Sequence, residues 1–197
     1  MIVTPDKSPA IFLDRDGTLM HDADYCSNPK QVRIFPGVPE ALQLLKKQGY
    51  KLIVITNQSG IGRGFFSVEQ YRAVEAEVLR QLGDHLIAAT YFCPDVPGEP
   101  SQCRKPAPGM VLKAAREHEI DLNRSFLIGD KEIDAECAHN AGVRAIRVKT
   151  GFDRDTEGSC ADWVAADLRD ATKIILAVTA QSDVLPNRAD AQGPPTG

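Results

Sequence analysis

The stretch FLDRDGTL, residues 12–19, places Asp14 and Asp16 directly after an apolar run that begins at Ala10. Carboxylates beside a buried strand are costly unless opposite charges, hydrogen bonds or a metal compensate them. In an open α/β sheet, ligands bind where the strands end at their carboxyl sides. The pair therefore marks a candidate site after the first strand, although two solvated acids in a turn would give the same pattern.

Apolar and amphipathic segments alternate along the chain. Strands are predicted at residues 10–13, 51–56, 89–93, 125–130 and 143–148, with a short edge strand within 161–168. Helices are predicted within residues 36–49, 67–83, 109–119 and 131–142. Ser67 and Gln70 have the spacing of a capping box at the start of the second helix. This alternation favours an α/β fold with a parallel sheet and helices on both faces.

The length of 197 residues suits one α/β domain with a sizeable core. We expect this domain to cover residues 1–180, and we expect residues 181–197, which are polar and rich in Pro and Gly, to form a flexible tail. The net charge of −4 gives no overall basic surface for nucleic acid. Because no export signal or membrane-spanning run is visible, we expect a cytoplasmic protein with no membrane partner. We also expect a monomer.

The five cysteines are odd in number and irregularly spaced. In a chain without an export signal we interpret them as reduced thiols. Cys93 and Cys103 are candidates for a metal site.

Three further polar residues follow predicted strands. Thr56 comes after a β-branched run and offers a hydroxyl to a phosphate, although a Thr/Asn turn explains it equally well. Lys105 precedes Pro106 and could neutralise a phosphate, although most lysines are simply exposed. Asp130 ends an apolar strand and could join Asp14 as a hard oxygen ligand for Mg²⁺, or could cap a helix.

Four segments carry a resemblance to a known family: FLDRDGTL (12–19), TNQSGIGRG (56–64), CRKPAPGM (103–110) and GDKEIDAECAHNAG (129–142). Together they resemble the haloacid dehalogenase superfamily of phosphotransferases. Within it they are similar to the branch of heptose bisphosphate phosphatases and histidinol-phosphate phosphatases. The resemblance implies a Rossmann-like, haloacid dehalogenase-type α/β fold with a mainly parallel sheet. The short segments after the first two strands indicate that the site is essentially capless.

The resemblance also implies a phosphatase that works through an aspartyl-phosphate intermediate. Asp14 would be the nucleophile. Asp16 would protonate the leaving alkoxide and then deprotonate the attacking water. Thr56 would donate a hydrogen bond to a phosphoryl oxygen, and Lys105 would supply a positive charge.

The metal ligands and substrate contacts are implied in the same way. Mg²⁺ would be bound by Asp14, by the backbone carbonyl of Asp16 and by Asp130. Asp134 would lie behind them and orient a lysine or a metal-bound water. The candidate substrate contacts are Asp22, Tyr25, Asn57, Gln58, Ser59, Arg63, Arg104 and Lys131.

One loop departs from the family pattern. The family usually shows Cys-x-His and then Cys-x-Cys before Arg-Lys-Pro, as the ligands of a zinc ion. Here CPDVPGEPSQCRKP (93–106) keeps Cys93 and Cys103 but has Asp95 and Ser101 at the other two positions. Because structural zinc normally has four N or S ligands, we expect little bound zinc. A three-ligand site of Cys93, Asp95 and Cys103 remains the alternative.

The implied function is the hydrolysis of a sugar phosphate monoester. The leading substrate is D-glycero-D-manno-heptose 1,7-bisphosphate, cleaved at its 7-phosphate during synthesis of heptose precursors for lipopolysaccharide or a related glycan. Histidinol phosphate or another small phosphate ester is the alternative substrate. A non-catalytic phosphate-binding protein is an alternative of another class, and the acidic net charge disfavours a nucleic-acid 3′-phosphatase.

Overall fold

A parallel sheet forms the centre of the fold. The computed structural model describes residues 7–83, 85–152 and 154–184. Within them six strands lie in the order β3-β2-β1-β4-β5-β6, and each neighbouring pair is parallel. The strands are β1 Ala10–Leu13, β2 Lys51–Asn57, β3 Ala89–Cys93, β4 Phe126–Gly129, β5 Arg144–Val148 and β6 Trp163–Ala165. The predicted parallel sheet is therefore confirmed.

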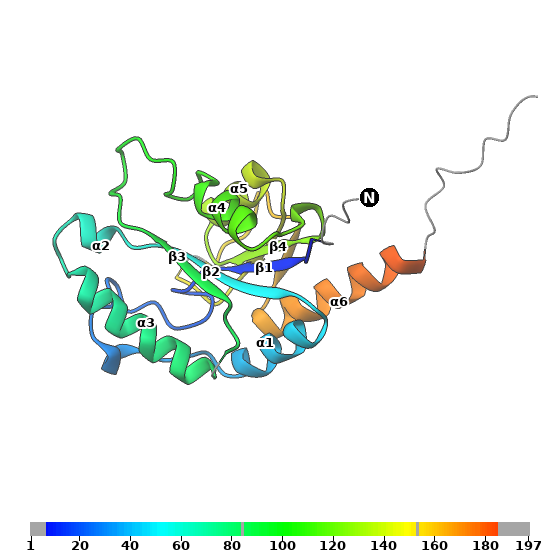
Figure 1. Cartoon of the computed structure of the whole chain (residues 1–197), viewed down its shortest axis with the longest axis horizontal. Coiled ribbons are helices and arrows are strands. Elements are labelled where there is room, and N and C mark those ends of the chain that lie inside the picture. The colour runs from blue at the N-terminus through cyan, green and yellow to red at the C-terminus, as the bar shows by residue number, and fades with distance from the viewer. Residues whose placement is uncertain (1–6, 84, 153, 185–197) are drawn as a thin grey trace, which may run out of the picture.

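Helices cover both faces of this sheet (Figure 1). They are α1 Val38–Lys47, α2 Ser59–Gly62, α3 Val68–Leu82, α4 Gly109–Glu117, α5 Glu132–Ala141 and α6 Leu168–Val184, with the 3-10 turns η1 Pro29–Gln31 and η2 Leu122–Arg124. Ile11 and Leu13 of β1 pack into the core shared with α1, α3 and α6, whereas Ala10 and Phe12 pack on the side of α4 and α5. Successive strand residues point to opposite faces, so a strand covered on both sides is apolar throughout.

The predicted strands and helices are confirmed, with boundary differences of a few residues. Trp163–Ala165 is the predicted edge strand. The predicted capping box also forms, because the Ser67 hydroxyl accepts from the backbone N–H of Gln70 and the Gln70 side chain accepts from that of Ser67.

Helix α6 was absent from the sequence-based expectations. Its buried residues Leu168, Ala171 and Ile175 belong to the core that also contains residues of α1. The tail was predicted to begin at residue 181, but α6 continues to Val184, so residues 181–184 are helical. The rest of the predicted tail, residues 185–197, lies outside the described residues.

Short connections leave the carboxyl end of the sheet open. Between β1 and α1 the chain forms the turn η1, and between β2 and α3 it forms the four-residue helix α2. Neither connection contains a separate folded unit. The essentially capless architecture expected from the sequence is therefore seen in the described part of the chain.

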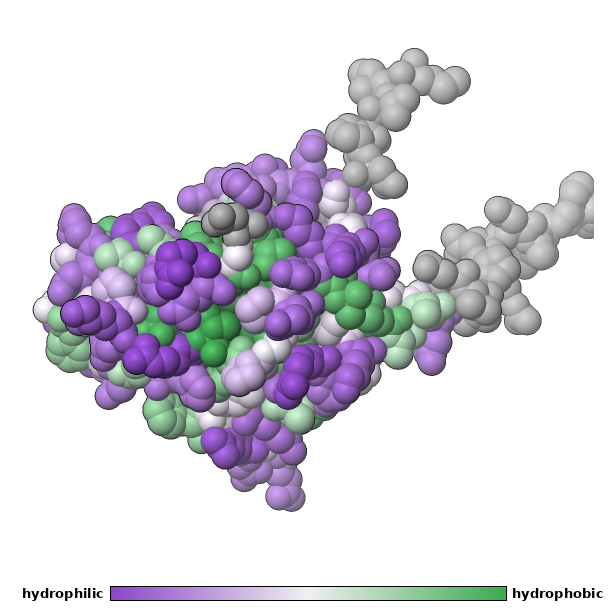
Figure 2. Space-filling view, turned by 90° about the horizontal axis from the view of Figure 1, so that it is seen from below, coloured by the Kyte–Doolittle hydropathy of each residue, from purple (hydrophilic) through white to green (hydrophobic). Residues whose placement is uncertain are grey.

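The outer side of α1, α3 and α6 is mostly polar. Figure 2 views this side, where purple polar residues surround a smaller apolar area. Leu44 of α1 is one of its exposed apolar residues. Among the described helices, none has both the length and the apolar character needed to cross a membrane.

We predict that α6 contributes to stability through its buried face. Ile175→Ala removes a fully buried side chain and should lower the free energy of unfolding by about 2–5 kcal/mol. Lys173→Ala, an exposed change on the same helix, is the control and should shift it by no more than ~0.5 kcal/mol. Urea denaturation measures both, and equal effects would contradict the assignment of this face to the core.

Candidate active site

The ends of β1, β2 and β4 bring together the four residues that the sequence singled out. Asp14 follows β1 and donates its backbone N–H to Ile128 of β4 at 2.9 Å. Thr56 lies near the end of β2, and Asp130 follows β4 directly. Lys105 reaches the same place from the loop between β3 and α4. All four residues are buried, which fits a site that works away from bulk water.

Lys105 joins two of the carboxylates. Its Nζ lies 2.8 Å from Asp14 Oδ1 and 2.6 Å from Asp134 Oδ1, and it donates to the Ile55 carbonyl at 3.2 Å. Burial would lower the pKa of Lys105, but Asp134 and Asp14 raise it above its ordinary value, so the lysine stays charged. Burial raises the pKa of Asp14, and Lys105 opposes that rise. Asp134, expected behind the ligands, thus contacts Lys105 directly.

Asp130 is the carboxylate of the cluster whose oxygens make no hydrogen bond to a described residue. It is fully buried. Burial raises its pKa, and the nearby Asp14 and Asp134 raise it further. A Cβ atom at Gly17 or at Gly151 would collide with its carboxyl group, so two glycines form the walls around it. Unpartnered buried oxygens of this kind are expected where a cation binds.

The donor set fits a hard divalent cation. Oxygens of Asp14, Asp130 and Asp134 lie within 4.8 Å of one another. If all three are ionised, the ammonium of Lys105 leaves two negative charges uncompensated, which matches one Mg²⁺. Carboxylate oxygens are also the ligands that Mg²⁺ prefers.

Asp16 is not part of this cluster of acids and is held by hydrogen bonds. Its carboxylate accepts from the guanidinium of Arg15 and from Gln58 Nε2, the latter at 2.9 Å. Gln58 Nε2 also donates to Thr56 Oγ1 at 2.8 Å. The predicted acid–base residue and the predicted phosphate hydroxyl are therefore connected through Gln58.

A pocket of ≈ 240 Å³ opens beside these residues. It is lined by Asp14, Asp16, Asp22, Asp24, Tyr25, Cys26, Thr56, Asn57, Gln58, Ser59, Gly60, Arg104, Lys105, Lys131 and Ile133. Seven of the eight predicted substrate contacts lie in this lining; the exception is Arg63, which is exposed. Burial lowers the pKa of Arg104, and the charge of Arg63, which is outside the lining, lowers it further.

Several predicted substrate contacts also have partners within the protein, Asn57 and Lys131 among them. The Asn57 side chain donates to the Lys105 carbonyl at 3.1 Å and accepts from its N–H at 3.0 Å. Lys131 Nζ lies 3.4 Å from Asp22 Oδ2. Asn57 therefore fixes the backbone of Lys105, a role that the sequence did not predict.

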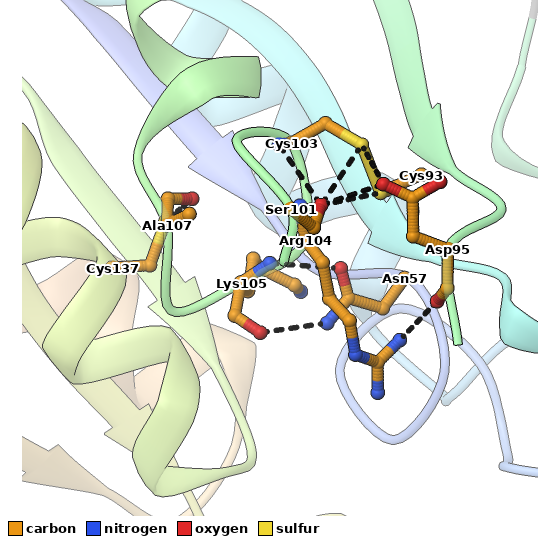
Figure 3. The surroundings of a disulfide bond; sticks show 9 residues. All are labelled: Asn57, Cys93, Asp95, Ser101, Cys103, Arg104, Lys105, Ala107 and Cys137. Carbon is orange, nitrogen blue, oxygen red and sulfur yellow. Dashed lines mark hydrogen bonds between the residues drawn. A yellow bond between two sulfur atoms is a disulfide. The ribbon is translucent and has the colours of Figure 1, made fainter. Parts of the chain in front are cut away.

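The loop with the altered zinc pattern contains a disulfide between Cys93 and Cys103, with Cα atoms 5.6 Å apart (Figure 3). The expectation of reduced thiols is wrong for this pair, because the loop returns Cys103 to the end of β3; Cys26, Cys137 and Cys160 are free. Sulfur, carboxylate and hydroxyl atoms of Cys93, Cys103, Asp95 and Ser101 gather here. These donors do not fit a four-ligand zinc site, since a hydroxyl stands at the fourth position and the sulfurs are bonded to each other.

Similarity to known protein families identifies the class of hydrolase to which this fold and these strand-end carboxylates belong. A family model described as haloacid dehalogenase-like hydrolase matches residues 11–89, and a second, HAD-hydrolase-like model matches residues 102–171. The chain belongs to the haloacid dehalogenase-like hydrolases.

Several relatives within this family are heptose bisphosphate phosphatases. The D-glycero-beta-D-manno-heptose-1,7-bisphosphate 7-phosphatase of Yersinia pestis is 40% identical over 181 residues, which are 86% of this chain and 96% of the relative. The enzyme of the same name from Pasteurella multocida is 41% identical, covering 84% of this chain and 96% of the relative. The crystal structure of D,D-heptose 1,7-bisphosphate phosphatase from B. bronchiseptica, complexed with magnesium and phosphate, superposes with a TM-score of 0.79 at 31% identity, covering 86% of this chain and 99% of that one.

Some residues of the site were missed in the sequence. Gly17 stands beside Asp16 in the opening motif, and its positive φ of 83° and its approach to Asp130 explain the glycine. Gly151 follows β5, and Thr150 next to it donates to the Gly17 carbonyl at 2.6 Å. The only available signal for Gly151 was a glycine shortly after a strand end, which is too common to indicate a site.

We predict that Mg²⁺ stabilises the protein more strongly as pH rises. The pKa values of Asp14 and Asp130 are raised to about 6 and about 8 in the metal-free folded protein. Between about pH 4 and these values the folded protein binds more protons than the unfolded chain, so its free energy of unfolding falls as pH rises. Mg²⁺ binds the ionised carboxylates instead. Its stabilisation should approach ~2.7 kcal/mol at a hundredfold excess over Kd. Thermal melts should show a larger shift at about pH 8 than at about pH 5.

The control for this effect is an acid outside the cluster. Asp130→Asn should abolish the Mg²⁺-dependent shift, whereas Glu136→Gln, an exposed change on α5, should retain it. A shift that is equal at both pH values, or that survives in Asp130→Asn, would contradict the assignment of the cation to this cluster.

We predict that the purified protein carries far less than one zinc per chain. As isolated without reductant, it should have three reactive thiols after denaturation, and five after reduction. Elemental analysis and thiol titration measure the two quantities. One zinc per chain together with five thiols in the unreduced protein would show instead that Cys93 and Cys103 bind metal.

Proposed function

We propose that this protein is a Mg²⁺-dependent phosphatase that removes the 7-phosphate of D-glycero-D-manno-heptose 1,7-bisphosphate. The observation that carries the proposal is the buried contact of Asp14 with Lys105, beside the unpartnered carboxylate of Asp130, in a pocket at the end of the sheet. The names of the relatives support the choice of substrate.

Asp14 is the proposed nucleophile. Its carboxylate attacks the phosphorus atom, an O–P bond forms to Asp14, and the bond from phosphorus to the sugar oxygen breaks. Asp16 gives its proton to that oxygen, so that the sugar leaves as an alcohol. In the second step Asp16 takes a proton from water, which attacks the phosphoryl group and releases Asp14 and inorganic phosphate.

Lys105 and Thr56 act on the phosphoryl oxygens. The ammonium of Lys105 already lies 2.8 Å from Asp14 Oδ1, where it attracts the dianionic phosphate toward the nucleophile. Asp134 and the Ile55 carbonyl hold this ammonium in place. Thr56 Oγ1 accepts from Gln58, so its own hydroxyl hydrogen is available for a phosphoryl oxygen.

Asp14, Asp130 and the backbone carbonyl of Asp16 are the proposed Mg²⁺ ligands. When bound, the ion neutralises the repulsion between the anionic nucleophile and the anionic phosphate. Asp130 would then have a partner for the oxygens that make no hydrogen bond to a described residue.

The far end of the substrate is proposed to lie toward Arg104. A second cavity of ≈ 430 Å³ shares Arg104, Lys105 and Ile133 with the first pocket. The guanidinium of Arg104 donates to the Asp95 carbonyl at 3.1 Å, and Arg63 lies close enough to lower its pKa. Arg104 in the lining, with the charge of Arg63 acting on it, favours a substrate with a second anionic group, which histidinol phosphate lacks.

The decisive experiment is a phosphate-release assay with Mg²⁺ over heptose 1,7-bisphosphate, other sugar bisphosphates, sugar monophosphates, histidinol phosphate and nucleotides. We expect the highest kcat/KM with the heptose bisphosphate and release of one phosphate per molecule. The sugar monophosphate product is identified by ³¹P NMR, which distinguishes the 1-phosphate from the 7-phosphate. Highest activity with histidinol phosphate would favour the alternative substrate, and no hydrolysis of any ester would contradict the phosphatase proposal.

We predict that Asp14→Asn lowers kcat by roughly 10³-fold or more, because an amide is a poor nucleophile. Asp155→Asn, an exposed change, is the control and should retain full activity. Circular dichroism checks that both variants are folded. Near-normal turnover by folded Asp14→Asn would remove Asp14 from the mechanism.

A further inference from the structure

Arg15 is buried beside the proposed active site, and the mechanism above does not use it. Its side chain is 3% exposed, and it lies between the two aspartates in the sequence. Long charged side chains are rarely buried unless they are paired. The ion pair that Arg15 makes is with Asp16, at 2.8 Å.

The contact between the two side chains is a fork. Arg15 Nε lies 3.2 Å from both carboxylate oxygens of Asp16, and Arg15 Nη2 lies 3.0 and 2.8 Å from them. Two parallel donors fix both the position and the plane of a carboxylate, which a single point charge cannot do. Asp16 itself remains 18% exposed and lines the pocket.

Arg15 also contacts helix α3 through Tyr71. The guanidinium lies over the ring of Tyr71, 5.6 Å from its centroid. Tyr71 is fully buried, and its hydroxyl donates to Glu75 one turn further along α3 at 3.3 Å. The backbone of Arg15 is fixed as well, because its carbonyl accepts from the N–H groups of Leu19 and Met20 at 2.9 and 3.1 Å.

We propose that Arg15, held against Tyr71, is a positioning residue that sets the place of the Asp16 carboxyl group beside Asp14. This inference rests on the proposed function, in which Asp16 transfers the proton to the leaving alcohol. Arg15, which precedes Asp16 in the sequence, thus connects the Asp16 carboxylate to the packed helix α3. Arg15 itself takes part in no covalent or proton-transfer step.

The test uses two kinds of ester. An alkyl phosphate, such as the sugar phosphate found active with the wild-type protein, needs protonation of its leaving group, whereas p-nitrophenyl phosphate does not. We compare kcat/KM because it covers the steps up to departure of the alcohol. Arg15→Gln should lower kcat/KM for the alkyl ester by ~10²-fold and for the aryl ester by less than ~10-fold.

Arg15→Lys keeps the buried positive charge and removes the fork, so it serves where Arg15→Gln does not fold. It should show the same preference for loss on the alkyl ester, with a smaller loss than Arg15→Gln. The matched control is Arg72→Gln, because Arg72 also lies 5.6 Å from the Tyr71 centroid but pairs with Glu75 and is largely exposed. Arg72→Gln should keep the wild-type ratio between the two esters.

A double-mutant cycle tests whether Arg15 acts through Asp16. In an Asp16→Asn background, changing Arg15 to Lys should cause no further loss of kcat/KM for the alkyl ester. Equal losses for both esters, additive losses in the double variant, or an altered ester ratio in Arg72→Gln would overturn the proposal. Its failure differs from failure of the proposed function, because the latter is seen as missing phosphatase activity in the wild-type protein.

Discussion

The site depends on one buried lysine, Lys105, which forms ion pairs with both Asp14 and Asp134. The carboxylates of Asp14, Asp130 and Asp134 lie close together, and burial alone would favour the neutral forms of Asp14 and Asp130. Removal of one partner from a buried pair typically costs about 3–5 kcal/mol, because the remaining charge is left without compensation. Lys105 therefore keeps Asp14 available as an anion at a place where an isolated aspartate would be protonated.

The sheet makes this arrangement possible because it gives each charge a fixed origin. Asp14 and Asp130 follow the neighbouring parallel strands β1 and β4, so their side chains leave the same edge. Lys105 has no strand of its own, and the side chain of Asn57, the last residue of β2, holds its backbone by two hydrogen bonds. Glycines at positions 17 and 151 then allow the loops to close around Asp130. The two negative charges that Lys105 does not balance would favour a divalent cation at this place.

The sequence pattern predicted the features that depend on neighbouring residues in the chain, namely the strands and the polar residues at their ends. Each apolar run predicted to be a strand is one, and the polar residues that follow β1, β2 and β4 converge as expected. Helix α6 escaped because its segment contains several β-branched residues, Ile174, Ile175 and Val178 among them, and its helical form depends on packing with α1. The disulfide and the contact of Arg15 with Asp16 escaped for another reason: both depend on side-chain directions that residue spacing does not determine.

The altered cysteine loop is closed by hydrogen bonds to Ser101. The Ser101 hydroxyl accepts from the backbone N–H groups of Cys103 and Arg104, and donates to the Asp95 carboxylate (Figure 3). These bonds close the loop at the position where four metal ligands would otherwise do so. Lys105, the next residue, is already fixed to β2 through Asn57, so the charge at the reacting centre is anchored to the sheet and not to the loop. Changes in the loop should then affect Arg104, whose guanidinium is bonded to the Asp95 carbonyl, more than they affect Lys105. In this chain the loop would thus influence recognition of the far end of the substrate, while the sheet, with contacts from α3 and α5, holds the groups proposed for bond cleavage.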